Sequence, residues 1–188
     1  MKEHLFLPLG GGNAAVVSGS DWSSAVTDKP KLTCVGTSGG YTPAREFADA
    51  ETQTMRTVVP FPNEMRCVNN TYCWPGMTLF WRTKAGWTGA AGNYVRWNWS
   101  VECNEDGDVI PAPIDTSYAK VSTYRADAAA AMVTTSDLGI MRMGAGASCN
   151  PGDLMWITLT REGAGSEDDI TQTVEVLGVD LSWTRYQQ

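Results

Sequence analysis

The chain has 188 residues, 43% of them hydrophobic and 19% charged, so it is long enough to bury a core and too apolar to be disordered throughout. Its 14 basic and 21 acidic residues give a net charge of −7, which argues against a partner with a phosphate backbone. No stretch approaches the roughly 18 apolar residues that a spanning helix needs, and the first residues lack the apolar centre of a secretory signal. We therefore expect one folded domain that binds neither nucleic acid nor membrane.

The first part of the chain predicts one strand and a long irregular arm. Residues 3–7 form the expected strand, and the small, polar segment from Gly10 to Pro30 has only Trp22 as a bulky anchor. Beyond it, glycine and proline recur at short intervals with β-branched and aromatic residues alternating between them, which is typical of an all-β sandwich or barrel. We therefore divide the chain into an N-terminal strand and arm, residues 1–30, and a single antiparallel β-sandwich domain, residues 31–188.

The middle of the chain contains the clearest strand patterns. Alternation from Tyr94 to Cys103 places five side chains on one face, and the other face carries Tyr94, Arg96 and Asn98. We assign four of the five to the core: Val95, Trp97, Trp99 and Val101. Residues 77–84 alternate as well, and this places Leu79 and Trp81 in the core. Because the small-residue loop 85–92 joins the two segments, we expect them to pair antiparallel across it.

The last third predicts two long strands joined by an acidic loop. A strand is expected over residues 154–161, a solvated turn over 162–169, and the final strand over 170–186. The hydrophobic phase changes within that final strand, which predicts a β-bulge near Gly178, the alternative being that the strand passes from one environment to another. These strands are expected to add Ile157 or Trp156, Leu181 and Trp183 to the core. Weaker strands are expected at residues 31–35, 55–59, 118–124, 131–134 and 139–143, and the only helical-looking run is 127–131.

Residues suited to catalysis or metal binding are scarce. His4 is the single histidine, and no nucleophile pattern accompanies it, so we interpret it as an edge-strand residue. The acidic clusters at residues 105–108 and 167–169 suit solvated turns, with calcium binding or a carboxylate pair for glycoside hydrolysis as alternatives. We therefore expect no enzymatic activity, no cofactor and no metal site.

The cysteines indicate little chemistry. There are 5 of them, an odd number that excludes complete pairing within one chain. We expect buried thiols in a reducing cell, and a loop-closing bridge between Cys67 and Cys73 is the alternative.

Tryptophan is abundant, and three of the eight tryptophans lie in predicted loops: Trp22, Trp74 and Trp87. An exposed tryptophan can anchor a protein interface or stack on a sugar ring, and it can also pack within its own loop. We take these three residues and His4 as candidate interface residues.

The C-terminal segment carries a recognisable pattern. A Pro-Gly-Asp turn at 151–153 leads a strand that ends in Arg161, a glycine-rich acidic loop reaches Asp169, and the sequence from Val176 to Thr184 closes the chain. This pattern, with an earlier strand pair at residues 76–108, resembles tailed-phage virion proteins over the part of the chain from Pro75 onward. The resemblance implies a jelly-roll β-sandwich, commonly trimeric, carried on the capsid or the tail.

Three functions follow as hypotheses. The first is a capsid decoration, or cement, protein on the virion surface, made in the host bacterial cytoplasm, which binds capsomer junctions of the major capsid protein and copies of itself. The second is a tail-associated fibre or receptor-binding module that recognises host glycans, and the third is a glycan hydrolase. Decoration comes first because the chain shows no shaft repeat. We expect the segment His4 to Pro30 to contact the capsid or neighbouring subunits, the alternative being that it wraps its own sandwich.

Overall fold

The computed structural model describes residues 2–8, 31–37, 40–61, 76–84, 93–104, 120–125, 134–140 and 152–184. Within these ranges every regular element is a strand, as the alternating sequence predicts. The strands are β1 (Lys2–Pro8), β2 (Lys31–Thr37), β3 (Gly40–Phe47), β4 (Thr52–Pro60), β5 (Gly76–Thr83), β6 (Tyr94–Asn104), β7 (Lys120–Arg125), β8 (Thr134–Ile140), β9 (Leu154–Glu162) and β10 (Val174–Thr184).

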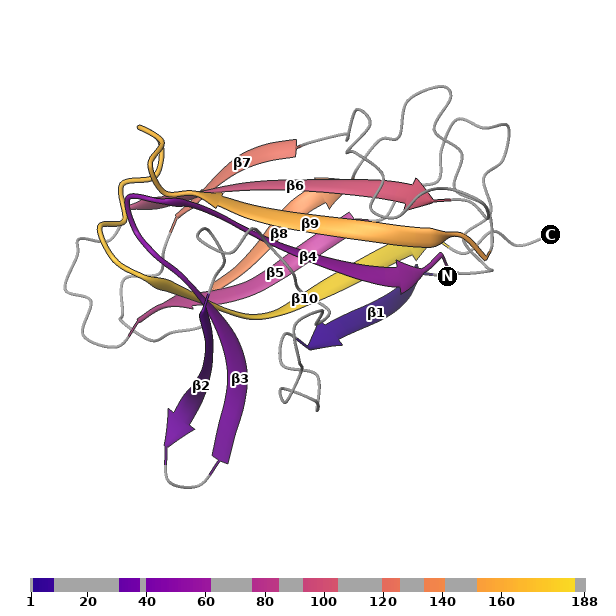
Figure 1. Cartoon of the computed structure of the whole chain (residues 1–188), viewed down its shortest axis with the longest axis horizontal. Helices are drawn as coiled ribbons and strands as arrows, with labels where there is room; N and C mark the ends of the chain where they lie inside the picture. The colour runs from indigo at the N-terminus through magenta and orange to yellow at the C-terminus, as the bar shows by residue number, and fades with distance from the viewer. Residues whose placement is uncertain are drawn as a thin grey trace.

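The strands form two antiparallel sheets that face each other across one core (Figure 1). The six-stranded sheet has the order β2-β3-β10-β5-β8, and β1 also pairs with β10. The four-stranded sheet has the order β4-β9-β6-β7. The predicted jelly-roll-like antiparallel β-sandwich is therefore confirmed.

The predicted core residues fill the space between the two sheets. The predicted core residues of β5, β6 and β10 are each at most 8% exposed. Of the two alternatives in β9, Ile157 faces the core and Trp156 does not. Trp97 lies at the centre, with its ring edge-on to Phe47 at 5.2 Å and to Trp81 at 6.3 Å between ring centroids. Because Trp97 belongs to one sheet and its two partners to the other, these aromatic contacts join the layers.

The expected pairing of residues 77–84 with residues 94–103 is wrong. β5 pairs with β8 and β10 in the six-stranded sheet, whereas β6 pairs with β7 and β9 in the four-stranded sheet. The two segments therefore face each other through the core instead of lying side by side. The physical reason is that alternation specifies which face of a strand is buried, and it says nothing about which strand lies alongside.

The predicted bulge in β10 is confirmed. The register of β10 with β5 shifts between Val176 and Gly178, so that Leu177 is the extra residue and the apolar side chains before and after it all face the core. Gly178 faces outward, where a Cβ atom would come within 2.3 Å of the Phe6 ring. Glycine at this position therefore lets Phe6 lie directly against the sheet, with its ring 6.0 Å from that of Phe80.

Three strands differ from the predictions. β8 runs unbroken through Asp137, where the sequence predicted an interruption between two strands, because its pairing with β5 skips Leu138. Leu138 is fully buried, and its carbonyl accepts a hydrogen bond of 3.3 Å from Trp99 Nε1 in the opposite sheet. β3 was not predicted, because it contains a glycine and Pro43, and both residue types are uncommon within strands. β10 begins at Val174, later than the expected residue 170.

Strand β1 belongs to the sandwich, because it pairs with β10 over its whole length, from Lys2 opposite Thr184 to Pro8 opposite Gly178. The remaining predictions for the arm and for several loops lie outside the described residues. They concern residues 9–30 with Trp22, residues 105–108, 127–131 and 141–143, and the side chains of Cys67, Cys73, Trp74 and Trp87.

Candidate binding site

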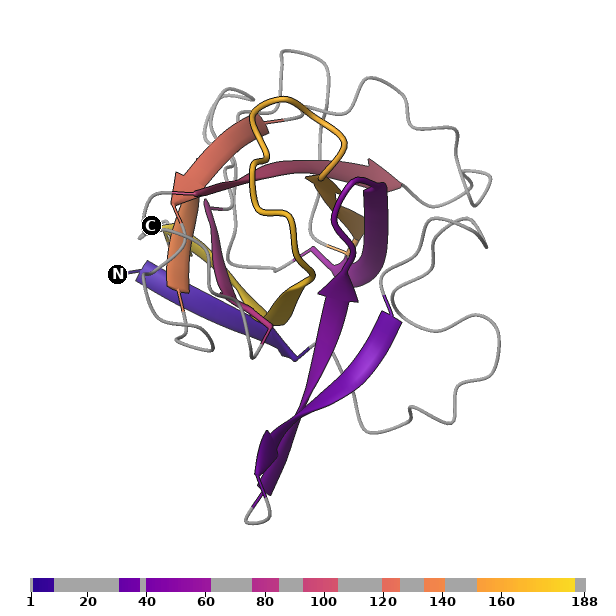
Figure 2. The ribbon, with the colours of Figure 1, turned by 90° about the vertical axis from the view of Figure 1, so that its left-hand side faces the viewer.

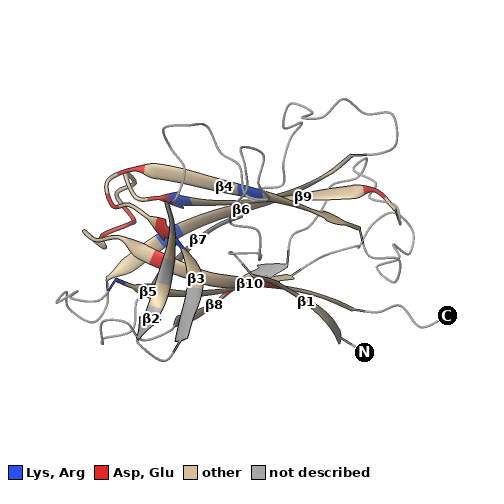
Figure 3. Cartoon of the chain, turned by 60° about the horizontal axis from the view of Figure 1, so that its bottom comes forward, with Lys and Arg blue, Asp and Glu red and all other residues tan. Residues whose placement is uncertain are grey.

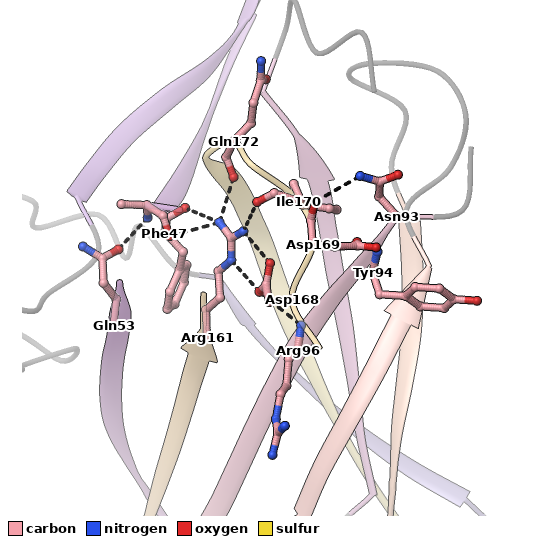
Figure 4. A network of polar contacts seen from close by, with 11 residues as sticks. Phe47, Gln53, Asn93, Tyr94, Arg96, Arg161, Asp168, Asp169, Ile170 and Gln172 are labelled. Carbon is pink, nitrogen blue, oxygen red and sulfur yellow. Dashed lines mark hydrogen bonds and ion pairs between the residues drawn. The ribbon is translucent and has the colours of Figure 1, made fainter. Parts of the chain in front are cut away.

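A buried arginine anchors one end of the sandwich. Arg161 follows Leu159 on the inward face of β9 and is 0% exposed. Its Nε and Nη2 atoms donate to the two oxygens of Asp168 at 2.9 and 2.8 Å, and the Asp168 side chain is also 0% exposed. The other guanidinium hydrogen bonds go to four backbone carbonyls, those of Phe47, Ala48, Ile170 and Gln172 (Figure 4). Every N–H of this guanidinium therefore has an acceptor.

Asp168 and the next residue, Asp169, attach the segment between β9 and β10 to the start of β6. Asp168 accepts a hydrogen bond from the Arg96 backbone N–H at 3.2 Å, and Asp169 accepts one from the backbone N–H of Tyr94. The Asp169 N–H in turn donates to the Tyr94 carbonyl at 3.0 Å, and Asn93 Nδ2 donates to the Asp169 carbonyl at 3.0 Å. The segment after Arg161 is thereby held against β6 from both its side chains and its backbone.

The expected solvated turn at residues 162–169 needs correction. Acidic residues do gather at this end of the molecule, as the red segments of the chain around the turn after β9 in Figure 3 show, and Glu167 and Asp169 are exposed. Asp168 instead turns inward and pairs with Arg161. Gly163 donates its N–H to the Glu51 carbonyl at 3.0 Å, and a Cβ atom there would approach that oxygen to 2.8 Å, so glycine permits the close turn.

The anchored end presents an aromatic and polar surface. Tyr94 is 43% exposed, and its ring points away from the buried network (Figure 4). Beside it on the outer face of β6, Arg96 lies between two carboxylates, with Nε 2.6 Å from Glu162 and Nη1 2.8 Å from Glu167. Asn98 Nδ2 donates to the other oxygen of Glu162 at 3.3 Å. We call these five residues the Tyr94 cluster.

The outer face continues along the four-stranded sheet from the Tyr94 cluster. Thr54 and Thr160 share a hydrogen bond of 2.9 Å on adjacent strands. Farther along, the guanidinium of Arg56 lies 4.8 Å from the ring centroid of Trp156. The face thus has one aromatic side chain at each end, Tyr94 and Trp156, with short polar side chains between them.

Of the four candidate interface residues, the structure describes only His4. Its Nδ1 lies 2.7 Å from Asp180 Oδ2 on the outer face of the six-stranded sheet, and its side chain is 54% exposed. It therefore lies on the sheet opposite to the Tyr94 cluster. Alternation puts Tyr94 on the face of its strand opposite to the predicted core residues, but Tyr94 is not among the four candidates chosen from the sequence. An aromatic residue in an outward phase was the signal that could have found it.

Other site chemistry is limited in the part of the chain that the structure describes. No group of three or more His, Cys, Asp or Glu residues there could hold a metal ion, and no helix there is long and apolar enough to cross a membrane. Cys103, near the end of β6, takes part in a disulfide. The expectation that all 5 cysteines are free thiols is therefore wrong.

Comparisons with known proteins yield likenesses of fold only. No protein-family profile matches the sequence, and no curated protein matches it. A family 11 carbohydrate-binding module from Clostridium thermocellum, solved with a β-1,3-1,4-mixed-linked tetrasaccharide, aligns with a TM-score of 0.46 and 11% identity over 95% of this chain and 94% of that one. The CBM27-1 module from Caldicellulosiruptor saccharolyticus, solved with mannohexaose, aligns with a TM-score of 0.45 and 8% identity over 95% of this chain and 96% of that one. An arabinose-bound MgGH51 α-L-arabinofuranosidase aligns with a TM-score of 0.46 and 9% identity over 87% of this chain, which spans 23% of that enzyme.

Proposed function

We propose that this chain is a non-catalytic glycan-binding module and that the Tyr94 cluster is its binding site. The observation that carries the proposal is an exposed aromatic ring next to an arginine, two carboxylates and an amide that already hold one another in place. A sugar presents an apolar C–H face and a rim of hydroxyl groups. An aromatic ring covers the first, and fixed polar side chains exchange hydrogen bonds with the second.

The buried network below the site supports this proposal. Arg161 and Asp168 fix the backbone on which Tyr94 and Arg96 stand, because Asp168 and Asp169 bind the backbone N–H groups of those two residues. A site whose side chains are already ordered loses little conformational freedom when a ligand binds. This order is important for binding sugars, because their hydroxyl groups give up hydrogen bonds to water and need well-aligned protein partners in return.

The charge of the site favours a neutral sugar over an acidic one. Arg96 is already paired with Glu162 and Glu167, and the neighbouring Asp169 is exposed. The whole chain carries a net charge of −7. A sulfated or uronic acid glycan would therefore meet like charge both at the site and at long range. We propose neutral host-surface glycans as the ligand class and a tail-associated position in a virion, in line with the resemblance to tailed-phage virion proteins.

Replacing Tyr94 by alanine tests the site. Loss of an aromatic contact of this kind costs about 0.5–1.5 kcal/mol, which corresponds to roughly a two- to tenfold weaker affinity. Binding is measured by titration calorimetry or affinity electrophoresis with neutral oligosaccharides, including mannohexaose, and with polysaccharides of bacterial surfaces. Tyr94→Phe keeps the ring and should retain most of the affinity.

The matched control is Phe6→Ala, which removes an aromatic side chain that is 54% exposed on the opposite sheet. We expect no change in sugar affinity from this variant, because Phe6 stands far from the Tyr94 cluster across the sandwich. Equal losses from Phe6→Ala and Tyr94→Ala would show that the binding is not located at the cluster. Absence of binding to every neutral glycan tested would overturn the proposed function.

Capsid decoration is the second candidate, and one observation favours it. The ribbon of β2 and β3 extends away from the sandwich (Figure 2), a shape suited to contact with another protein of a shell. Quantitative mass spectrometry of purified virions distinguishes the two positions. Hundreds of copies per particle are expected for decoration of capsomer junctions, whereas a dozen or fewer are expected for a tail module. In the first case the major capsid protein becomes the partner to test.

A further inference from the structure

The ribbon of β2 and β3 has no role in the Tyr94 cluster. Only the base of β3 joins the rest of its sheet, through pairs from Phe47 opposite Val174 to Arg45 opposite Val176. Beyond this base the two strands pair with each other alone among the described strands and extend away from the sandwich (Figures 1 and 2). A two-stranded ribbon without a third strand is marginally stable in water, so its free edge invites a partner strand.

The two edges of the ribbon are not equivalent. Cys34 faces Pro43 across the ribbon, and because proline has no N–H, this is a pair without hydrogen bonds between its members. Residues of such pairs direct their backbone groups away from each other. Pro43 therefore offers no donor to the outer edge of β3, which protects that edge against strand addition.

On the β2 side the same alternation leaves donors and acceptors facing outward. Leu32 opposite Arg45 and Gly36 opposite Tyr41 have the same phase as Cys34. The pairing of Arg45 with Val176 of β10 agrees with this phase, because Arg45 must then direct its backbone groups away from β2. Leu32, Cys34 and Gly36 thus present their N–H and C=O groups along the free edge of β2.

Beyond Lys31 at its first residue, this edge lacks the charges that usually prevent strand addition. No charged residue occurs between Leu32 and Ala44, in a chain of which 19% is charged. Lys31 lies at the end of β2, at the base of the ribbon, whereas the edge strands β4 and β8 each carry their charged residue, Arg56 and Asp137, in the middle of the strand. One face of the ribbon is already covered, since Val35 is 9% and Ala44 is 0% exposed. The edge, and not this face, is therefore the surface available to a partner.

We propose that β2 pairs edge to edge with β2 of a second copy of this chain, so that two ribbons form one four-stranded sheet. Such a pair is self-complementary, because each outward-facing residue supplies both an N–H and a C=O group to its counterpart. The length of the ribbon lowers the electrostatic repulsion between the two copies in this arrangement. Two chains of net charge −7 repel each other. Leu32 to Thr37, the uncharged part of β2, spans about 20 Å, which keeps the two sandwiches apart by more than the screening length of about 8 Å in physiological salt.

The test compares Gly36→Pro with Gly36→Ala in the full chain. Proline removes one outward N–H and places its ring on the free edge, whereas alanine keeps the N–H; the bonds to β3 made by Val35 and Thr37 remain in both variants. Light scattering over a wide range of protein concentrations gives the mass, which is 20.4 kDa for one chain. We expect wild type and Gly36→Ala to reach twice this mass, and Gly36→Pro to associate about tenfold more weakly or worse.

Hydrogen exchange of the peptide that covers residues 31–37 is the second measurement, and it also serves if Gly36→Pro fails to fold. Pairing predicts that protection of this peptide in the wild-type protein rises with protein concentration, while that of β6 stays constant. A wild-type protein that remains at 20.4 kDa overturns the proposal. A trimer in which the exchange of β2 does not change on association also overturns the proposal. So does protection of β2 that arises only when another virion protein binds. Sugar binding by the Tyr94 cluster is unaffected by either result.

Discussion

Replacing Arg161 by methionine should destabilise the folded protein by about 3–5 kcal/mol, the usual cost of removing one partner of a buried ion pair. Methionine fills much of the space but leaves Asp168, whose side chain is 0% exposed, without its counter-charge. It also leaves four carbonyl oxygens without their donor. Chemical denaturation followed by tryptophan fluorescence measures the change in the free energy of unfolding.

The control for this prediction is Arg96→Met. The Arg96 side chain is 26% exposed and pairs with Glu162 and with Glu167, which is 60% exposed. Surface pairs of this kind contribute about 1 kcal/mol or less. Combining Arg161→Met with Asp168→Asn should cost less than the sum of the two single changes, because the isolated buried charge is then absent. If Arg161→Met costs no more than Arg96→Met, the anchor at this end of the sandwich does not stabilise the fold.

Truncation of Trp97 to alanine should cost about 3–5 kcal/mol, as expected when a large buried aromatic side chain leaves a cavity. Trp97 is 0% exposed and touches Phe47 and Trp81 of the opposite sheet, so its loss removes contacts that hold the two layers together. Trp97→Phe should cost less. It keeps most of the ring contacts, and Trp97 Nε1 has no hydrogen-bond partner in the described part of the chain that phenylalanine would forfeit.

The neighbouring Tyr94 provides the comparison within the same strand. Tyr94 is 43% exposed and lies on the outward face of β6, so Tyr94→Ala should change the free energy of unfolding by only about 0.5 kcal/mol. Thermal or denaturant unfolding of both variants gives the difference. Similar costs for Trp97→Ala and Tyr94→Ala would contradict the assignment of the two faces of β6.

Only part of the Tyr94 cluster could be predicted from the sequence. Alternation predicted correctly that Tyr94, Arg96 and Asn98 lie on the outward face of one strand. It could not place Glu162 and Glu167 beside them, because Glu162 ends β9 and Glu167 follows it, and both reach Arg96 only when β9 lies next to β6. His4 was chosen from the sequence, yet it lies on the other sheet. Neighbours across strands depend on strand order, which a period of two does not encode.

The class of fold, the side chains of the core and the bulge at Gly178 are predictable from the residue pattern, because each follows from which residues along one strand are apolar. The same alternation put Arg161 in phase with Ile157 and Leu159 on the buried face of β9. The pattern does not predict that β5 and β6 lie in different sheets or that Asp168 turns inward to meet Arg161, because both depend on the arrangement of the strands in space. A charged side chain in a buried phase needs a partner, because burial removes its hydration. The residue pattern does not indicate which residue that partner is. The partner is chosen by the path of the chain after β9, which returns Asp168 to the guanidinium and the backbone of β6.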